Sequence, residues 1–515
     1  MCNHLTRREF IHRGSYGLMG LTMIPSILQN QLLQAFENGV PMDSLSEIYD
    51  SFMVTPELIR SVMETALSKG GDYCDLYFQH AIYNEIGLQD DAVNNASSSI
   101  GLGLGIRVLK GDQTGYSFSE DLSESAIRKA ARTAATIASD GKGIAPEQLI
   151  RRDIPNYYPI KTPWEDVSIE TKIPILQNLN ENARQLDSRI IKTGIRFTDY
   201  TSTVLIATSE GRVVHDYRPM GQISLSCTAD ENGIRESLRQ SISARMGIEL
   251  MSEENLDHLA RKTVEQVTSL LKAGKPPAGE MEVVLAQGSA GILLHEAIGH
   301  GMEADFNRKG TSIYSDLLNK KVAEPFVTVV DDGTNPNIRG SLNIDDEGND
   351  TEHTVLVDKG ILRGYLHDRI SARHYGVKPT GNGRRESFRH APMPRMRNTY
   401  MLSGPHDPEE IIASVRNGIY ADTFTNGEVH IGAGDFTFYV KAGFLIENGK
   451  LTKPIKDINI IGNGPEVLRN ITMVGNDLKL SEGGWRCGKN GQSVPVSQGI
   501  PTAKVAKVTV GGTAG

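Results

Sequence analysis

Two histidines five positions apart constrain the local fold of this chain more than any other feature. His295 and His300 lie in an apolar segment that has the composition of a helix. At 3.6 residues per turn, a five-residue step rotates by roughly 140°, so a regular α-helix would point the two imidazoles toward different faces. If the two histidines act together, the helix must be distorted. We predict a π-type bulge, or unwinding at Gly299 and Gly301, because glycine tolerates such backbone and π-bulges concentrate at functional sites.

The same segment has the residues of a zinc site with its own base. Neutral imidazole is the commonest protein ligand of zinc. Glu296 follows His295 directly, where a general base can take a proton from zinc-bound water. The more familiar zinc-protease motif differs, since its histidines are four residues apart. The alternative is that both histidines are ordinary residues of a half-buried helix and that Glu296 is simply exposed.

A third zinc ligand is expected elsewhere in the chain. Catalytic zinc usually has three protein ligands and keeps one position open for water. Cys487 is the best candidate, because it lies in the glycine-dense segment from Gly483 to Gln492. The arginine and lysine of this segment suit a loop that lowers a thiol pKa. The alternative is that Cys487 is a small buried hydrophobic residue.

Composition limits the other functions that this chain can have. The four cysteines, at positions 2, 74, 227 and 487, are too few and too scattered for a disulfide framework. Cys74 and Cys227 lie in alternating segments, so we predict that they belong to core strands. The formal net charge of −9 gives no reason to expect nucleic-acid binding, which calls for a basic patch. We therefore expect no direct binding to nucleic acid.

The length of the chain predicts more than one domain. A chain of 515 residues is too long for a single hydrophobic core. The segment Gly274–Gly279 (GKPPAG) is the clearest linker. We predict an α+β protein with two domains, residues 46–273 and residues 280–515, each with an antiparallel or mixed sheet and flanking helices. The second domain is expected to be β-rich and to carry the helix with the metal motif.

Local patterns predict the main elements. Helices are expected over Pro56–Ser68, Glu124–Ser139, Ile169–Leu186 and Asn255–Ala273, and strands over Tyr73–Gln79, Glu85–Asp90, Arg196–Thr208, Val213–Ala229, Met281–Ala286, Thr354–Leu366, Glu428–Ile431, Phe436–Glu447 and Ala503–Val510. The segment Gly101–Gly105 (GLGLG) superficially suggests a phosphate loop. It lacks the third glycine at the required spacing and the helix that should follow, so it is predicted to be a strand with bulges or close packing.

The N-terminus, residues 1–45, is similar to a twin-arginine export signal. Arg7 and Arg8 precede a phenylalanine and an isoleucine, and a weakly apolar run follows from Ser15 to Leu28. We expect export to the periplasm, although no A-x-A cleavage site precedes Val40. The alternative is an amphipathic helix with a solvated basic start, which would leave the protein in the cytoplasm. The run is shorter and more polar than the roughly 20 residues that a spanning helix needs, so no stable membrane span is expected.

Several longer segments resemble the TldD/PmbA family of zinc metallopeptidases, specifically its catalytic TldD branch. The resemblance covers most of the chain from about residue 50 onward and is densest after about residue 280. The segments that carry it are His295–Gly310 (HEAIGHGMEADFNRKG), Thr380–Pro394 (TGNGRRESFRHAPMP), Met473–Leu480 (MVGNDLKL), Cys487–Pro501 (CGKNGQSVPVSQGIP) and Val508–Ala514 (VTVGGTA).

The resemblance implies a site and a function. His295, His300 and Cys487 fall on the positions of the family's zinc ligands, and Glu296 falls on that of its catalytic glutamate. The family implies hydrolysis of unfolded or short peptides, maturation of modified peptides such as a microcin, and an older label of DNA gyrase modulator. It also implies a dimer, either of two identical chains or with an inactive TldE/PmbA-like paralogue that lacks the metal motif.

Two other functions remain open from the sequence. The chain could be a metal-bearing subunit that binds or assembles peptides without cutting them, or an esterase or amidase that uses the same zinc. Peptide cleavage that a chelator abolishes would separate hydrolysis from binding.

Two arginines are further candidates for contact with a substrate. Arg384 and Arg385 lie on a predicted turn, where a guanidinium could hold a peptide carboxylate or stabilise an oxyanion. The alternative is an ion-paired surface loop.

Overall fold

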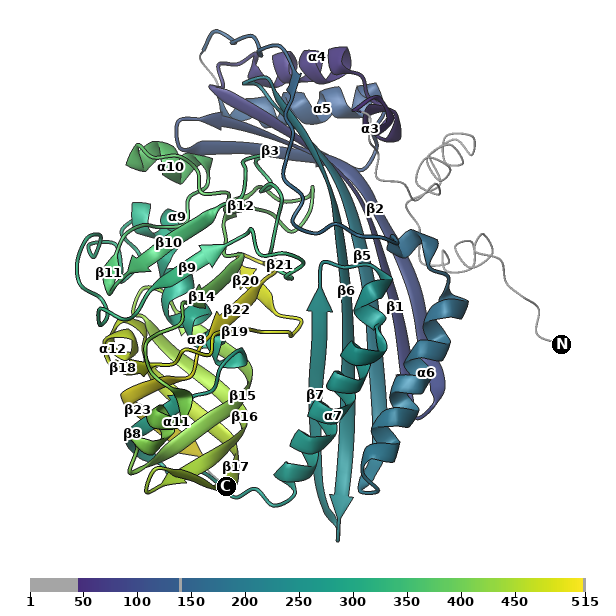
Figure 1. The fold of residues 1–515 in the computed structure, drawn as a ribbon. Coiled ribbons are helices and arrows are strands. Elements are labelled where there is room, and N and C mark those ends of the chain that lie inside the picture. Colours follow the sequence, from purple (N-terminus) through teal and green to yellow (C-terminus); the bar gives the residue numbers. More distant parts are fainter. Residues whose placement is uncertain (1–44, 139–140, 513–515) are drawn as a thin grey trace, which may run out of the picture.

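The computed structural model describes residues 45–138 and 141–512. The predicted export signal, with Arg7 and Arg8, lies outside these residues. The fold is α+β, as predicted, with antiparallel and mixed sheets. Figure 1 shows a long twisted sheet beside a group of shorter strands. We call residues 45–273 the N-terminal half, which contains the long sheet, and residues 274–512 the C-terminal half.

Seven strands of the N-terminal half form one sheet, in the order β3-β2-β1-β5-β6-β4, with β7 paired to β6. The strands are β1 Tyr73–Gln89, β2 Ala92–Lys110, β3 Gln113–Ser119, β4 Ile150–Arg151, β5 Ile190–Thr208, β6 Arg212–Glu231 and β7 Ile234–Ala244. The prediction of two separate strands in the first of these segments is wrong. β1 is continuous because it is paired with β2 on one side and with β5 on the other along its length.

Helices cover this half, and all four of the helices predicted for it are present. They are α3 Leu45–Ser51, α4 Pro56–Leu67, α5 Glu124–Ala134, α6 Ile169–Leu186 and α7 Glu253–Leu270, with short 3₁₀ segments at Ala135–Ile137, Trp164–Asp166 and Ile248–Met251. The hydroxyls of Thr55, Ser123 and Ser252 accept hydrogen bonds from backbone N–H groups at the first turns of α4, α5 and α7. Such caps satisfy donors that a helix start leaves unpaired, which explains why these helices begin where they do.

The two faces of the long sheet have different partners. On β1, Cys74, Leu76 and Phe78 belong to the core beneath α4 and α5. Tyr77, between them, packs instead with Phe388 of the C-terminal half. Successive side chains of a strand point to opposite faces, so a single strand contacts both layers. The C-terminal half therefore packs against one face of the sheet.

The glycines of the predicted close-packed strand lie at this contact. A Cβ on Gly103 would overlap the ring of Phe388, and one on Gly105 would overlap the hydroxyl of Tyr116. Both glycines are part of β2, so the prediction of a strand with close packing is confirmed.

The C-terminal half contains a small closed sheet. Its order is β17-β16-β15-β8-β23-β18, and an additional pairing between β17 and β23 closes five strands on themselves. The strands are β8 Gly279–Leu285, β15 Asn417–His430, β16 Asp435–Glu447, β17 Lys450–Asn463, β18 Ile471–Val474 and β23 Ala503–Gly512. β8 and β15 run parallel, so the sheet is mixed. The segment from Gly274 to Gly279 connects α7 to β8, and the division into domains at this segment stays a prediction.

A second six-stranded sheet of this half has the order β11-β10-β9-β14-β22-β19. Its strands are β9 Val329–Asp332, β10 His353–Asp358, β11 Ile361–Leu362, β14 Asn398–Met401, β19 Lys479–Leu480 and β22 Ser497–Ile500; two hairpins, β12 Gly383–Arg384 with β13 Met393–Pro394 and β20 Arg486–Lys489 with β21 Gln492–Pro495, complete the strands. The prediction of one strand over Thr354–Leu366 is wrong. Lys359 and Gly360 both have positive φ and form a turn between β10 and β11.

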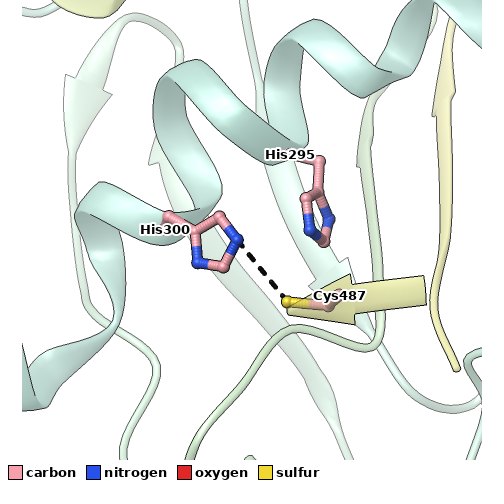
Figure 2. Close-up of side chains that lie close together, drawn as sticks. All are labelled: His295, His300 and Cys487. Carbon is pink, nitrogen blue, oxygen red and sulfur yellow. Dashed lines mark hydrogen bonds between the residues drawn. The ribbon is translucent and has the colours of Figure 1, made fainter. Parts of the chain in front are cut away.

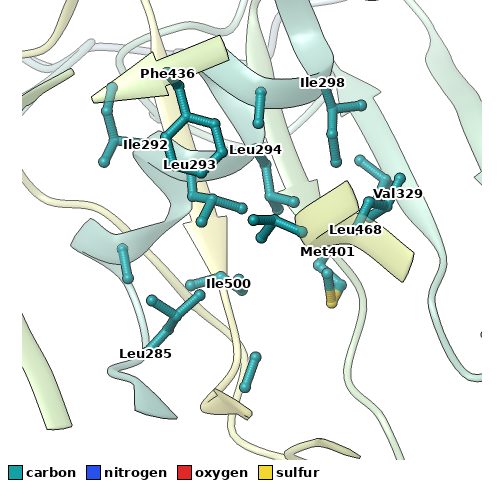
Figure 3. Packing of buried hydrophobic residues seen from close by; sticks show 14 of the residues in the cluster. Leu285, Ile292, Leu293, Leu294, Ile298, Val329, Met401, Phe436, Leu468 and Ile500 are labelled. Carbon is teal, nitrogen blue, oxygen red and sulfur yellow. The ribbon is translucent and has the colours of Figure 1, made fainter. Parts of the chain in front are cut away.

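Short helices complete this half and hold the metal motif in its core. They are α8 Ile292–Leu294, α9 Ala304–Arg308, α10 Arg369–Tyr375, α11 Pro408–Ala413 and α12 Gly464–Arg469. Figure 3 shows Leu293, Leu294 and Ile298 packed among buried side chains of both C-terminal sheets. Each such aliphatic side chain contributes about 1.5–3 kcal/mol on burial, which fixes the segment on which His295 lies. Within the described residues, no helix is long and apolar enough to cross a membrane.

Buried charges join the two halves. The guanidinium of Arg107 on β2 contacts Asp75 on β1 at 2.5 Å and Glu347 of the C-terminal half at 2.7 Å. Arg218 on β6 contacts Asp346 at 2.5 Å. Removing one partner from a buried pair costs about 3–5 kcal/mol because the other charge is left uncompensated. These pairs therefore fix how the C-terminal half lies on the sheet.

Candidate metal centre

The metal-motif helix is distorted as predicted. His295–Gly299 (η6) is a π-helix between α8 and the 3₁₀ turn His300–Met302 (η7). The N–H of His300 donates to the carbonyl of His295, a step of five residues. In a π-turn, residues five apart lie one above the other, so both imidazoles point to the same side. The predicted π-type bulge is confirmed.

Tight contacts hold the π-helix in place. The hydroxyl of Tyr314 donates to the carbonyl oxygen of Ala297, 3.0 Å away, and so satisfies an acceptor inside the distorted segment. A Cβ on Gly299 would overlap the sulfur of Met396. Glycine at this position lets a core methionine pack directly against the π-helix.

Cys487 approaches the two histidines from the opposite side. Figure 2 shows His295 and His300 side by side on one helix, with the sulfur of Cys487 below them on a strand. The donor atoms of the three residues lie within 4.8 Å of one another, and all three residues are buried. The sulfur of Cys487 is 3.5 Å from Nε2 of His300. The structure thus brings together the three residues predicted to bind zinc.

A tight hairpin presents Cys487. β20 and β21 are joined by Asn490 and Gly491, both with positive φ, the signature of a type I′ turn. The prediction of an irregular loop is therefore wrong, although the Asn-Gly pair was a signal for this hairpin. Cys487 and Lys489 alternate with exposed neighbours along β20, so both point into the protein.

The donor set fits zinc in number, type and separation. Thiolate and imidazole are the ligands that zinc prefers in proteins. With Zn–S near 2.3 Å and Zn–N near 2.0–2.1 Å, two ligands of a tetrahedral zinc lie about 3.6 Å apart. The separation of 3.5 Å between Cys487 Sγ and His300 Nε2 agrees with this value. Three protein donors would leave a fourth position open for water or substrate.

The surroundings stabilise the form of cysteine that binds zinc. Burial alone raises the pKa of the Cys487 thiol, but His300 and His295 outweigh it and hold this pKa well below its ordinary value. The thiolate, not the thiol, is the metal ligand. The site is thus prepared for a cation before any cation arrives.

Glu296 lies beside this cluster. Its Oε2 is 4.0 Å from Nε2 of His300, and its side chain is 13% exposed. Burial raises the pKa of Glu296, the direction expected for a group that accepts a proton at neutral pH. The alternative, that Glu296 is simply exposed, is wrong.

Two further charged residues of the site were not predicted from the sequence. Glu303 accepts a hydrogen bond from Nδ1 of His300 at 3.0 Å, and Lys489 lies 3.1 Å from Glu303. The three-residue step from His300 to Glu303 was a possible signal, since residues three apart are neighbours on a helix. No pattern in the sequence indicates the contact with Lys489.

Arg384 and Arg385 are buried, so they are not part of an ion-paired surface loop. Arg384 donates to the carbonyls of Met396 and Pro495. Arg385 contacts Asp75 at 3.2 Å and lies over the ring of Tyr77. Both guanidinium groups thus have partners within the protein, and a role for either in substrate binding stays a prediction.

Sequence comparisons identify relatives along almost the whole chain. Residues 74–138, 162–271 and 278–512 match models of the PmbA/TldA metallopeptidase domain 1, central domain and C-terminal domain. A relative from Buchnera aphidicola, named metalloprotease TldD homolog, is 40% identical over 88% of this chain and 95% of its own length. One of the same name from Haemophilus influenzae is 39% identical over 89% of this chain and 97% of its own length.

Two more distant relatives add a metal and a fold. A Saccharolobus solfataricus protein, 29% identical over 86% of this chain and 97% of its own length, is named zinc metalloprotease TldD homolog. The crystal structure of TldE from Thermococcus kodakarensis superposes with a TM-score of 0.70 at 18% identity, over 88% of this chain and 99% of that one. This structural likeness supports the fold described above.

Proposed function

The chain belongs to the TldD/PmbA family of metallopeptidases, and on that premise we propose that it is a zinc-dependent peptidase. In this proposal His295, His300 and Cys487 hold the zinc and Glu296 is the catalytic base. One observation carries it: the three donors converge in a buried cluster, and a carboxylate lies next to it. Chain segments far apart in sequence build this arrangement.

The proposed chemistry is peptide hydrolysis. Bound zinc would act as a Lewis acid that polarises the peptide carbonyl and lowers the pKa of water from roughly 15.7 to about 7. Glu296 takes the proton from the attacking water and returns it to the leaving amine. Its position 4.0 Å from His300 Nε2 keeps the carboxylate beside the open side of the cluster. Partial burial keeps it from being an ordinary solvated acid.

An adjacent strand edge supports a peptide as the substrate. β15 pairs with β8 only from Gly418 to Ala421, and in the described structure its continuation as far as His430 pairs with β16 alone. On this continuation, a Cβ on Gly427 would come within 3.1 Å of the side chain of Glu296. An extended peptide that hydrogen-bonds to the free edge would run past the base, and such backbone pairing depends little on side chains. Unfolded or short peptides fit this mode.

Removing and restoring zinc tests the proposed function. The full chain is stripped with a strong chelator, reloaded with zinc, and assayed on an unstructured peptide, on a folded protein and on a simple ester. We expect cleavage of the unstructured peptide alone, lost on stripping and recovered with zinc. Zinc binding without cleavage of any substrate would contradict hydrolysis and support the alternative of a peptide-binding or assembly subunit. Turnover of the ester alone would contradict the peptidase assignment.

The proposal includes a partner and a location. We propose a dimer, formed with a second copy of the chain or with an inactive TldE/PmbA-like paralogue, because a TldE shares this fold. Light scattering of the chain alone and mixed with such a paralogue would give its mass. We also propose export through the twin-arginine route, based on Arg7, Arg8 and the apolar run that follows.

A further inference from the structure

Glu303 links the two chain segments that carry the proposed zinc ligands. It follows η7 on the metal-motif segment and is fully buried. Its Oε2 accepts a hydrogen bond from Nδ1 of His300 at 3.0 Å. A proton on Nδ1 leaves the lone pair of His300 on Nε2, the atom that faces the sulfur of Cys487. The carboxylate thus selects the tautomer of His300 that can bind a metal through Nε2.

Lys489 extends this contact to the strand that carries Cys487. Its Nζ lies 3.1 Å from the same carboxylate and 2.7 Å from Asp305, and it donates to the carbonyl of Pro394. Lys489 is two residues after Cys487 on β20, on the same face of the strand. An ion pair at this position ties the hairpin to the segment with both histidines.

A third segment closes the network. Arg395 is fully buried; its Nε lies 3.9 Å from Glu303, and its Nη2 donates to the carbonyl of Cys487. Burial raises the pKa of Glu303, but Lys489 and His300 outweigh it and lower this pKa to about 2. Burying an ion pair is costly unless its geometry serves a further purpose, because both charges lose their hydration. Here the contacts of the carboxylate converge on the residues around the proposed zinc.

We propose that Glu303 and Lys489 are positioning residues of the metal centre. Glu303 orients His300, and the Glu303–Lys489 ion pair holds Cys487 at ligand distance from it. This inference rests on the proposed zinc site but does not depend on which bond the enzyme cleaves. Partners that orient metal-binding histidines typically change metal affinity by about 10–100-fold when they are removed.

Zinc affinity of three variants tests the pair. Glu303→Leu removes both the acceptor and the charge, Glu303→Gln keeps the acceptor, and Lys489→Met removes the cation. The dissociation constant is measured on the full chain by competition with a coloured chelator, and the thermal midpoint of each zinc-free protein is recorded. We expect Glu303→Leu and Lys489→Met to weaken zinc binding by about 10–100-fold and Glu303→Gln to be less affected. Glu303→Gln nearly preserves shape, so it remains informative if Glu303→Leu does not fold.

A buried lysine in the N-terminal half provides a matched control. Lys172 lies 2.7 Å from Asp199 and next to the ring of Trp164, much as Lys489 lies next to that of Phe306. Lys172→Met should lower the thermal midpoint and leave zinc affinity unchanged, since it lies on α6.

The outcomes separate this inference from the proposed function. If Lys489→Met and Glu303→Gln bind zinc as tightly as the Lys172→Met control does, the pair only stabilises the fold and the inference is wrong. If the wild-type chain binds zinc but cleaves nothing, the peptidase proposal fails while the positioning result stands. If the wild type binds no zinc, both fail.

Discussion

His300 Nε2 lies 3.5 Å from the sulfur of Cys487, although 187 positions separate the two residues in the chain. Only the folded protein brings these donors together, so zinc should bind the native state and not the unfolded chain. Metal binding and stability are therefore linked.

Replacing the thiol should break this link. Zinc at a hundred times its dissociation constant stabilises a one-site protein by about 2.7 kcal/mol, seen as a higher thermal midpoint. We expect Cys487→Ser to lose most of that gain and to bind far less zinc. Cys227→Ser is the matched control, because Cys227 is equally buried but lies in β6, where burial raises the pKa of its thiol to about 12. A zinc-induced shift in Cys487→Ser equal to that of the control would contradict the ligand assignment.

The π-helix depends on the absence of a side chain at Gly299. Replacing glycine by alanine normally stabilises a helix by about 0.5–1 kcal/mol. At Gly299 we expect the opposite sign, a loss of about 1–3 kcal/mol in the free energy of unfolding, because the new methyl group overlaps buried Met396. Urea denaturation measures the change.

Gly101 is the control for this prediction. A Cβ at Gly101 meets nothing within 4 Å, so Gly101→Ala should change stability by no more than about 0.5 kcal/mol. Equal effects at Gly299 and Gly101 would show that packing against the π-helix does not matter.

Acid should weaken a contact between α7 and the segment before Cys487. Glu482 lies 3.1 Å from Lys262 and 2.9 Å from Lys479, and its carboxylate also contacts His258. Burial raises the pKa of Glu482, but Lys262 and Lys479 outweigh it and lower this pKa to about 2. A lowered pKa contributes stability above the unfolded value of about 4.3, and that contribution is lost as the pH falls toward 2.

Glu482→Gln isolates this contribution. In zinc-free protein, the wild type should be more stable than the variant at pH 6, and the difference should shrink below about pH 4.3 and vanish near pH 2. The exposed pair of Glu64 with Arg60 provides a control, since Glu64→Gln should have almost no effect at any of these pH values. A difference that stays constant from pH 6 to pH 2 would contradict the assignment.

Export depends on two arginines that precede the described residues. Changing both Arg7 and Arg8 to lysine keeps the positive charge of the N-terminus but removes the pair that defines the signal. We expect the protein to leave the periplasmic fraction and to accumulate in the cytoplasm. Replacing the downstream Arg13 with lysine is the control and should leave export intact. Periplasmic protein from the double variant would exclude the twin-arginine route.

The sequence predicted those parts of the fold and site that depend on local pattern. The amphipathic segment Ile169–Leu186 is a helix with the predicted bounds, and the five-residue step from His295 to His300 required the π-bulge that the structure contains. The hairpin of Cys487 was missed although its Asn-Gly turn is a local signal. The contact of Glu303 with Lys489 could not be predicted, because it depends on how two distant segments pack.

Cleavage by Glu296→Gln tests the central claim most directly. Glutamine keeps the size of the side chain but cannot take a proton, and general acid–base groups contribute about 10²–10⁴-fold to rate. Zinc content and cleavage of an unstructured peptide are measured on the same samples of wild type and variant. The account predicts about one zinc per chain in both, with cleavage reduced in the variant by about 10²–10⁴-fold. Normal cleavage by the zinc-loaded variant would contradict the assignment of Glu296 as the base.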